Sequence, residues 1–361
     1  MPETEEQSMR YPEFLKDHGT IVMVAPSFGC TTEPYKTLFD SARRKLKKMG
    51  YNLRIGPNCT LDDGIGISST PYRCGRELES AYRSDKGNVI MSVGGGELMC
   101  EDLDYIDFEK IEESRPKWFM GYSDNTNFSF LLNTLCDTAA VYGPCASSFG
   151  AEPWHNSLYD AMDLLKGDKL SLTGYGMYET ESLRAEDRPL APINPTQKTE
   201  LHLFKGVSGM RYTDKCAKNT RHVTMRGRLV GGCMDCLRGL IGTKYDNVKS
   251  FSDHYKEEGI LWFLESCDLN VLDLRRTLWQ MESAGWFDNA SGFIIGRPMN
   301  GDEMMGLDRY DAVCGILGQH GVPIVMDADL GHVPPMVPVI SGCYACVSAA
   351  PDNWKIDMEL I

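Results

Sequence analysis

The chain has 361 residues, of which 42% are hydrophobic and 24% charged, and its formal net charge is −14. This length suits two α/β domains better than one small core, and no apolar run reaches the ~20 residues of a membrane span. The negative charge would repel a phosphate backbone or an anionic membrane surface, so neither nucleic acid nor a membrane is expected as a partner.

The cysteines and the N-terminal sequence indicate a cytoplasmic protein. The 13 cysteines are odd in number and scattered, which fits reduced thiols better than a disulfide framework. The segment MPETEEQSMRYPEF lacks a basic start followed by an apolar run, so no secretory signal is expected.

From Gly19 onward, short β-rich runs alternate with amphipathic helical stretches, which predicts a parallel sheet covered by helices. A strand over 88–93 runs directly into the triple glycine at 94–96, and a strand over 117–121 is followed closely by Ser123. The other elements expected in this part are strands over 20–26, 51–55 and 139–143 and helices over 34–49, 76–82 and 124–136.

The pattern weakens in the middle of the chain and then returns. Residues 166–221 show no sustained period, which predicts a linker with irregular substrate loops. We therefore expect an N-terminal domain over 15–165 and a smaller C-terminal α/β domain over 222–361. The second domain is expected to contain strands over 228–232, 260–265, 291–296, 323–327 and 344–348 and a helix over 272–284.

Ser123 is a candidate nucleophile because it lies in MGYSDN (120–125), between a predicted strand and a predicted helix. A serine on such a tight turn exposes its hydroxyl and directs the next amide, that of Asp124, the same way. The match to the Gly-x-Ser-x-Gly elbow is incomplete, since Asn125 replaces the second glycine. The alternative is that Ser123 only caps the following helix.

The triple glycine ends a neighbouring strand, so its amides would face Ser123 across the carboxyl edge of the sheet. Gly95 and Gly96 are the candidates for the second oxyanion donor. The alternatives are a plain turn or a phosphate cradle, although the segment lacks the Lys-Ser/Thr of a P-loop.

A serine hydroxyl needs a base, and His332 is the candidate among seven histidines. It alone stands in a loop stiffened by glycine and proline, LGHVPPMVP (330–338). Glu265 ends the apolar strand LWFL (261–264), and a buried carboxylate there needs a partner. His332 is one such partner, and a purely structural one is the alternative.

These segments together resemble the serine peptidase family of LD-carboxypeptidases and microcin C immunity-type carboxypeptidases. The matching motifs occur in the same order along most of the chain: VAPS (24–27), the glycines at 94–96, PK (116–117), GYSD (121–124), YGP (142–144), GG (231–232), GT (242–243), LE (264–265) and GH (331–332).

The resemblance implies a fold, a catalytic triad and a substrate class. It implies a Rossmann- or flavodoxin-like N-terminal domain with Ser123, a C-terminal domain with Glu265 and His332, and the active site at their interface. The amides of Asp124 and of Gly95 or Gly96 would hold the oxyanion. Family members are commonly homodimers and need no metal or other cofactor, and they cleave an amide in small peptides or peptidyl-nucleotides.

The motifs favour the immunity-type branch over murein recycling. The segment SVGGGE (92–97) lacks the Arg-Gly-Gly-Tyr-Gly form associated with murein-recycling members, and YGP resembles the immunity type. Hydrolysis of the terminal D-alanine of murein tetrapeptides is the alternative. A third possibility is a small-molecule binding module with an idle triad, and a fourth is an amidase acting on other acyl conjugates.

Two Cys-x-x-Cys pairs invite a zinc site, but their spacing argues against it. Cys233 and Cys236 form one pair, and Cys343 and Cys346 form the other, far along the chain. Zinc ribbons bring such pairs together over much shorter spacings, so no metal site is expected.

Overall fold

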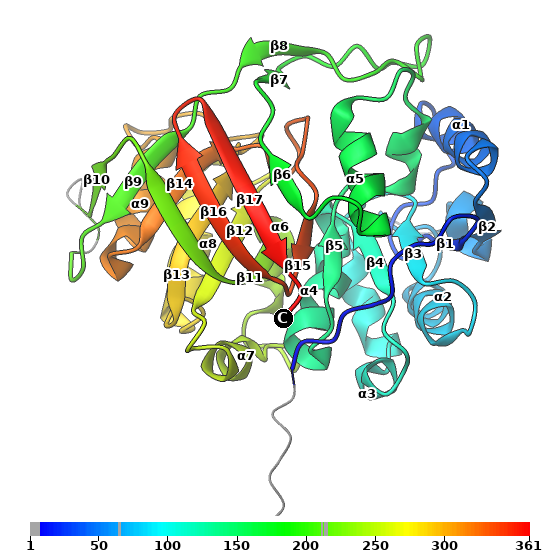
Figure 1. Ribbon diagram of the computed structural model, residues 1–361, viewed down its shortest axis with the longest axis horizontal. Coiled ribbons are helices and arrows are strands. Elements are labelled where there is room, and N and C mark those ends of the chain that lie inside the picture. Colours follow the sequence, from blue (N-terminus) through cyan, green and yellow to red (C-terminus); the bar gives the residue numbers. More distant parts are fainter. Residues whose placement is uncertain (1–7, 64–65, 211, 213–215) are drawn as a thin grey trace, which may run out of the picture.

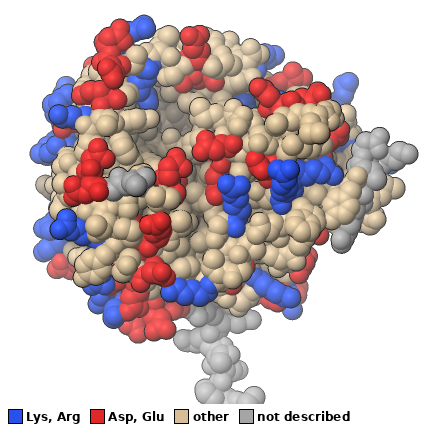
Figure 2. Space-filling model, turned by 180° about the vertical axis from the view of Figure 1, so that it is seen from behind, with Lys and Arg blue, Asp and Glu red and all other residues tan. Residues whose placement is uncertain are grey.

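Two β-sheets organise the chain into two lobes, with helices packed around them (Figure 1). The computed structural model describes residues 8–63, 66–210, 212 and 216–361. Among these residues, no helix is long and apolar enough to cross a membrane. Acidic and basic side chains are intermixed on the face shown in Figure 2.

The first lobe is built on a six-stranded sheet in the order β15-β5-β4-β3-β1-β2. All neighbours pair in parallel except β15, which runs antiparallel to β5. The strands are β1 (Thr20–Val24), β2 (Asn52–Ile55), β3 (Val89–Ser92), β4 (Trp118–Gly121), β5 (Ala140–Tyr142) and β15 (Val339–Ser341). The helices are α1 (Tyr35–Lys48), α2 (Pro71–Arg83), α3 (Phe108–Glu112), α4 (Thr126–Cys136) and α5 (Asn156–Lys166). The 3₁₀ turns are η1 (Pro57–Thr60), η2 (Met99–Tyr105), η3 (Ser123–Asn125) and η4 (Ala146–Gly150).

The second lobe is built on a nine-stranded sheet in the order β10-β9-β14-β13-β12-β11-β16-β17-β6. Its centre, β11 to β14, is parallel, and the strands on both sides pair antiparallel. The strands are β6 (Ser171–Thr173), β9 (His202–Gly206), β10 (Ala217–Asn219), β11 (Val223–Cys233), β12 (Ile260–Glu265), β13 (Ala290–Gly296), β14 (Pro323–Ala328), β16 (Tyr344–Ala350) and β17 (Asn353–Glu359). The helical elements are α6 (Met234–Leu240), α7 (Val248–His254), α8 (Val271–Ser283), α9 (Arg309–Leu317) and η5 (Gly318–His320).

The segment predicted to be a linker with irregular loops, residues 166–221, contains five short strands instead. β6, β9 and β10 join the second sheet, while β7 (Met177–Glu179) and β8 (Pro195–Lys198) form a separate hairpin. These strands have three to five residues each, which is too short for the alternation of apolar and polar residues to stand out. β6 and β9 pair with β17 and β14, which lie far away in the sequence, so the tertiary fold specifies them. β7 pairs with β8 and β10 pairs with β9 inside the segment itself.

The two lobes are joined by more than the connecting chain. β15 comes from the C-terminal part of the sequence but extends the first sheet beside β5. The Cys233 amide, where β11 ends, donates to the Thr126 hydroxyl at the start of α4 over 3.0 Å. These contacts fix the end of β11 against the turn that precedes α4, where Ser123 lies.

Candidate active site

The carboxyl ends of four parallel strands bring the predicted site residues together. β3 leads to the glycines at 94–96 and β4 leads to Ser123, and these two strands are neighbours. In the second lobe, β12 ends on Glu265, and His332 lies in the loop that follows β14. Strand ends of this kind are where open α/β sheets bind their ligands.

The turn at Ser123 has the geometry of a nucleophile elbow. Ser123 has a φ of 63°, in the left-handed region that residues other than glycine rarely adopt. A Cβ on Gly121 would lie 2.8 Å from the side chain of Asn125, so the strand must end in glycine. The side-chain amide of Asn125 donates to the carbonyl of Gly94 over 2.9 Å and ties the glycine segment to this turn.

Asp124 holds the same turn through its buried carboxylate. It accepts hydrogen bonds from the Ser27 hydroxyl at 2.5 Å, the Met99 amide at 2.9 Å and the side chain of Asn127 at 3.0 Å. Burial raises the pKa of Asp124, while these donors lower it by less. The carboxylate is thus occupied inside the protein, which leaves the Asp124 amide as the group available for the predicted oxyanion role.

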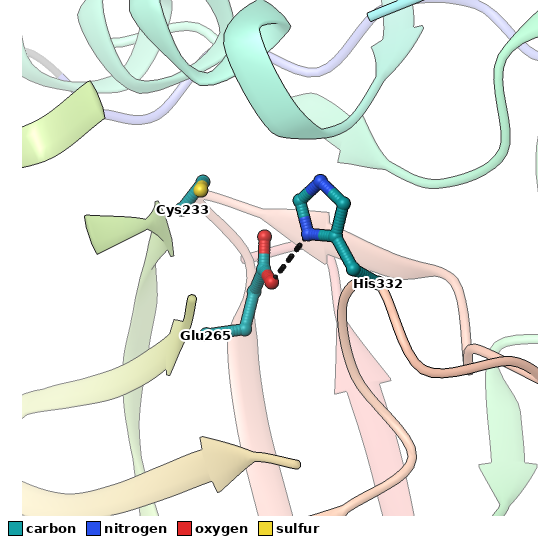
Figure 3. Close-up of side chains that lie close together, drawn as sticks. All are labelled: Cys233, Glu265 and His332. Atoms are coloured by element: carbon teal, nitrogen blue, oxygen red, sulfur yellow. Dashed lines mark hydrogen bonds and ion pairs between the residues drawn. The ribbon is translucent and has the colours of Figure 1, made fainter. Parts of the chain in front are cut away.

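A chain of hydrogen bonds joins the three candidate catalytic residues across the two lobes. Nε2 of His332 lies 2.9 Å from Oγ of Ser123, and Nδ1 lies 2.8 Å from Oε2 of Glu265. Figure 3 shows the Glu265 carboxylate facing the imidazole ring. Because a carboxylate accepts hydrogen bonds, Nδ1 carries the proton in the neutral ring, which leaves Nε2 as the acceptor for the serine hydroxyl.

The environment of His332 both positions its ring and changes its basicity. Gly331 has a φ of +88°, and a Cβ there would lie 2.2 Å from Oε2 of Glu265, so only glycine lets the loop pass the carboxylate. Burial lowers the pKa of His332, but the charge of Glu265 and hydrogen bonds to Cys267 and Glu265 raise it by more. The resulting pKa lies above the usual imidazole value.

Tyr142 connects the nucleophile to the carboxylate by a second route. Its hydroxyl donates to Oε1 of Glu265 over 2.5 Å and accepts from the Ser123 amide over 3.4 Å. Burial raises the pKa of Tyr142, and the nearby charge of Glu265 raises it further, so the phenol stays protonated and donates. Both oxygens of the fully buried Glu265 therefore have a partner.

The glycine segment leaves open space beside the serine hydroxyl. Of the described residues, a Cβ on Gly95 would have only Ser123 within 4 Å, at 3.3 Å from both the Cβ and the Oγ of the serine. The Gly95 carbonyl is held by the amide of Phe28 at 2.7 Å. Gly96 has a φ of +152° and lies against the Ser27 side chain, where a Cβ would approach Oγ to 1.9 Å. This backbone is therefore held close to Ser123.

Cys233 lies near Glu265 and His332, and together the three have the donor types of a zinc site (Figure 3). One donor atom from each lies within 4.8 Å of the others. Glu265 and His332 already bond to each other, and each has a second partner in Tyr142 or Ser123. The two Cys-x-x-Cys pairs do not meet, because Cys343 bonds to Leu229 near the middle of β11 while Cys233 ends that strand.

Comparison with known proteins identifies the family. The description "LD-carboxypeptidase N-terminal domain" matches residues 21–143, and "LD-carboxypeptidase C-terminal domain" matches residues 226–347. The chain belongs to the LD-carboxypeptidase family. A Vibrio cholerae protein that carries the name of a carboxypeptidase is 25% identical over 358 residues, which cover 97% of this chain and 98% of that protein. A Streptomyces coelicolor protein with a similar name is 21% identical over 296 residues, 78% of this chain and 75% of its own length.

Solved structures show that this LD-carboxypeptidase-family chain shares the fold of microcin immunity proteins. An MccF-like protein from Bacillus anthracis superposes with a TM-score of 0.77 at 22% identity, covering 97% of this chain and all of that one (100%). The microcin C7 self-immunity protein MccF gives a TM-score of 0.76 at 20% identity, covering 97% and 99%. An MccF-like protein from Streptococcus pneumoniae, solved with AMP, gives 0.73 at 21% identity, covering 94% and 98%. The predicted two-domain α/β fold is confirmed.

Several residues around the site were not identified from the sequence. The sequence presents Tyr142 only as part of the YGP motif and Asn125 only as a departure from the elbow pattern. Cys267 lies two residues after Glu265 and raises the pKa of His332, but an isolated cysteine gives no signal of that influence. Contacts between lobes of this kind depend on how the sheets face each other.

Proposed function

We propose that this chain is a serine carboxypeptidase in which Ser123 is the nucleophile, His332 the general base and Glu265 the residue that orients the base. The observation that carries the proposal is the unbroken hydrogen-bond chain Ser123–His332–Glu265, with distances of 2.9 and 2.8 Å. The strained φ of Ser123 supports it, because strain at a turn of this kind is concentrated at functional sites.

The first half of the reaction forms an acyl-enzyme. Nε2 of His332 takes the Ser123 proton while Oγ attacks the amide carbonyl, and Glu265 stabilises the imidazolium that results. His332 then gives this proton to the nitrogen of the leaving amine as the C–N bond breaks. In the second half, water attacks the acyl carbon while His332 accepts its proton. His332 then returns this proton to Oγ of Ser123 as the C–Oγ bond breaks, which releases the acid and restores the serine hydroxyl.

The oxyanion of the tetrahedral intermediate would be held by the amide of Asp124 and an amide of the glycine segment, Gly95 or Gly96. The open space beside Oγ of Ser123 supports this assignment, because an oxyanion has to lie near both the nucleophile and its donors. Losing one such donor in another serine hydrolase costs about 10²- to 10³-fold in kcat.

The proposed substrates are small peptides or peptidyl-nucleotides, with the immunity type favoured. The microcin C7 self-immunity protein has been solved with glutamyl sulfamoyl guanosine and with aspartyl sulfamoyl adenosine, and this chain shares its fold. The YGP motif at 142–144 points the same way. A murein tetrapeptide, cleaved before its terminal D-alanine, is the second candidate, supported by the family to which the chain belongs.

The test is mass spectrometry of the products formed from aspartyl sulfamoyl adenosine and from a murein L,D-tetrapeptide. Wild type and the Ser123→Ala variant are compared, with Ser80→Ala as the control because Ser80 is an exposed serine on α2. Sulfamoyl adenosine released by wild type and by Ser80→Ala, but not by Ser123→Ala, supports the immunity type. Release of D-alanine alone assigns the murein reaction. Full activity of Ser123→Ala contradicts the nucleophile assignment.

We further propose that the protein is a cytoplasmic homodimer that works without a metal. Sedimentation velocity gives its mass in solution. Activity that is unchanged after dialysis against a chelator supports the metal-free mechanism, whereas lost activity restored by zinc would assign a role to the Cys233, Glu265 and His332 donors.

A further inference from the structure

A cavity opens beside His332 and Tyr122, and its lining differs in charge from the rest of the protein. Tyr122, His155, Arg184, Ile193, His332 and Met336 are among the residues around it. None of the lining residues is acidic, although the chain carries a net charge of −14. Burial lowers the pKa of His155, which is therefore neutral near pH 7. His332 also lines the cavity, but its charge comes and goes with its proton, whereas the guanidinium of Arg184 stays charged.

The half-buried side chain of Arg184 has a guanidinium nitrogen without a partner in the described protein. Its Nε is buried and has no hydrogen-bond partner among the described residues. No carboxylate in the described part of the chain forms an ion pair with it either. An unsatisfied donor on a charged group costs free energy, and a carboxylate that binds it would remove this cost. The arrangement fits a site that is completed by a ligand.

The loop that carries Arg184 is fastened to both lobes. It connects β7 to β8, and Figure 1 shows this hairpin at the top of the molecule with its loop reaching toward α5. The Glu179 amide donates to the Pro334 carbonyl over 2.7 Å, close to His332 in sequence. On the other side, the Glu152 amide donates to the Leu190 carbonyl over 2.8 Å. These bonds hold the loop over the cavity beside the candidate base.

The size of the cavity limits what Arg184 can meet there. The cavity measures about 100 Å³. One water takes up roughly 10 to 15 Å³ of such volume, so there is room for a group the size of one small amino-acid residue. Apolar side chains such as Ile193, Leu158 and Met336 line it together with the arginine. A short side chain ending in a carboxylate suits this combination.

We propose that Arg184 binds a carboxylate of the substrate and that the cavity selects substrates with a carboxylate within one residue of the scissile amide. This rests on the proposed function, since it treats the Ser123–His332–Glu265 chain as the reacting centre. Two sources share this chemistry: the terminal carboxylate of a peptide, and the side-chain carboxylate of an aspartyl or glutamyl group. The planar guanidinium pairs with either through two parallel hydrogen bonds.

The test measures binding by calorimetry to Ser123→Ala protein, so that turnover does not interfere. Two matched pairs of ligands separate the sources: aspartyl against asparaginyl sulfamoyl adenosine, and an L,D-tetrapeptide with a free carboxylate against its C-terminal amide. Each pair differs only in the negative charge. We compare Arg184, Arg184→Gln and Arg184→Lys, with Arg188→Gln as the control because Arg188 lies on the same loop but is 63% exposed and near Asp187.

With Arg184 present, we expect the acidic member of one pair to bind about 10- to 100-fold more tightly than its neutral partner. The pair that shows this preference identifies the source of the carboxylate. The preference should vanish in Arg184→Gln, survive in part in Arg184→Lys and be unchanged in Arg188→Gln. An equal preference with and without Arg184, no preference at all, or no binding of any of the four ligands would overturn the proposal.

Carboxylate binding by Arg184 and hydrolysis by Ser123 can fail independently of each other. A carboxylate preference that depends on Arg184, found together with an absence of hydrolysis by the Ser123 protein, would keep the binding site and reject the carboxypeptidase. Hydrolysis that depends on Ser123 but shows no effect of Arg184 would do the reverse.

Discussion

Replacing Glu265 by glutamine tests whether this carboxylate sets the protonation of His332. In the native protein both oxygens accept hydrogen bonds, Oε2 from Nδ1 of His332 at 2.8 Å and Oε1 from the hydroxyl of Tyr142 at 2.5 Å. A glutamine has one oxygen and one NH₂ group. If the oxygen stays with Tyr142, which donates, the NH₂ group faces His332.

The NH₂ group would then force Nδ1 to accept, so the proton moves to Nε2 and the ring no longer takes the proton of Ser123. The same change of tautomer in another serine hydrolase lowers kcat about 10⁴-fold, so we expect a loss of about 10³- to 10⁴-fold here. Adding Tyr142→Phe releases the amide to turn its oxygen toward His332. The double variant should therefore be more active than Glu265→Gln alone.

The pH dependence gives a second measure of the same interaction. The base must be neutral, so kcat/KM rises with pH through the pKa of His332, which Glu265 raises above its usual value. Without the negative charge this pKa falls, and the acidic limb of the profile should move to lower pH. Cys267, Tyr122 and Glu97 also lie near the ring, and they are unchanged in this variant.

The assay is kcat/KM across the pH range, together with nitrogen-15 chemical shifts of His332 to identify its tautomer. Glu282→Gln is the matched control, since it makes the same change at a carboxylate that hydrogen-bonds to another histidine, His320 (2.7 Å), outside the site. The control should keep normal kcat and an unshifted profile. The reasoning is refuted if Glu265→Gln keeps kcat within about 10-fold of wild type and the acidic limb of its kcat/KM profile stays at the same pH.

Three further predictions concern the surroundings of the nucleophile and one buried acid. Gly95→Ala places a methyl group 3.3 Å from Oγ of Ser123, so kcat should fall about 10²-fold while urea unfolding stays near wild type; full activity would remove the glycine segment from the oxyanion site. Tyr142→Phe leaves Oε1 of Glu265 unsatisfied, and kcat should fall about 10-fold with an altered pH profile of kcat; a change in stability alone would make the tyrosine structural. Asp102 is fully buried, has no partner for either oxygen among the described residues, and burial raises its pKa to about 9. Asp102 binds a proton more tightly in the folded than in the unfolded state. The free energy of unfolding should therefore fall as the pH rises from the ordinary pKa of 3.8 to about 9, by about 1.4 kcal/mol per pH unit. Asp102→Asn should lose this dependence, and identical pH slopes in urea unfolding of the two proteins would contradict it.

The elements that surround the site were largely predictable because each is specified locally. The strand that begins at Thr20, the helix that Gly50 ends and the strand that ends on Glu265 all follow from short-range patterns of apolar residues and stop signals. The middle of the chain was not predictable in this way. β6 and β9 are short and pair with β17 and β14, which lie far away in the sequence, and β10 joins the sheet only through β9.

The candidate site likewise contains residues that the sequence reveals and residues that it does not. Ser123, Glu265 and His332 could be named from the sequence, because each residue type stands in a local context that suits its chemistry: a tight turn, the end of an apolar strand and a stiff loop. Their roles and those of the Asp124, Gly95 and Gly96 amides await the experiments above. The hydroxyl of Tyr142 and the guanidinium of Arg184 gave no such local signal.

The sequence by itself therefore determined the two α/β lobes, the family and the three residues that are brought within hydrogen-bond distance. Only the tertiary structure decided which groups complete the site. Tyr142 reaches Glu265 because the ends of β5 and β12 face each other across the lobes, and Arg184 lines the cavity beside His332 because the β7–β8 loop is fastened to both sides of it. The physical reason is that these contacts join segments that are far apart in the chain, so that no pattern among neighbouring residues encodes them.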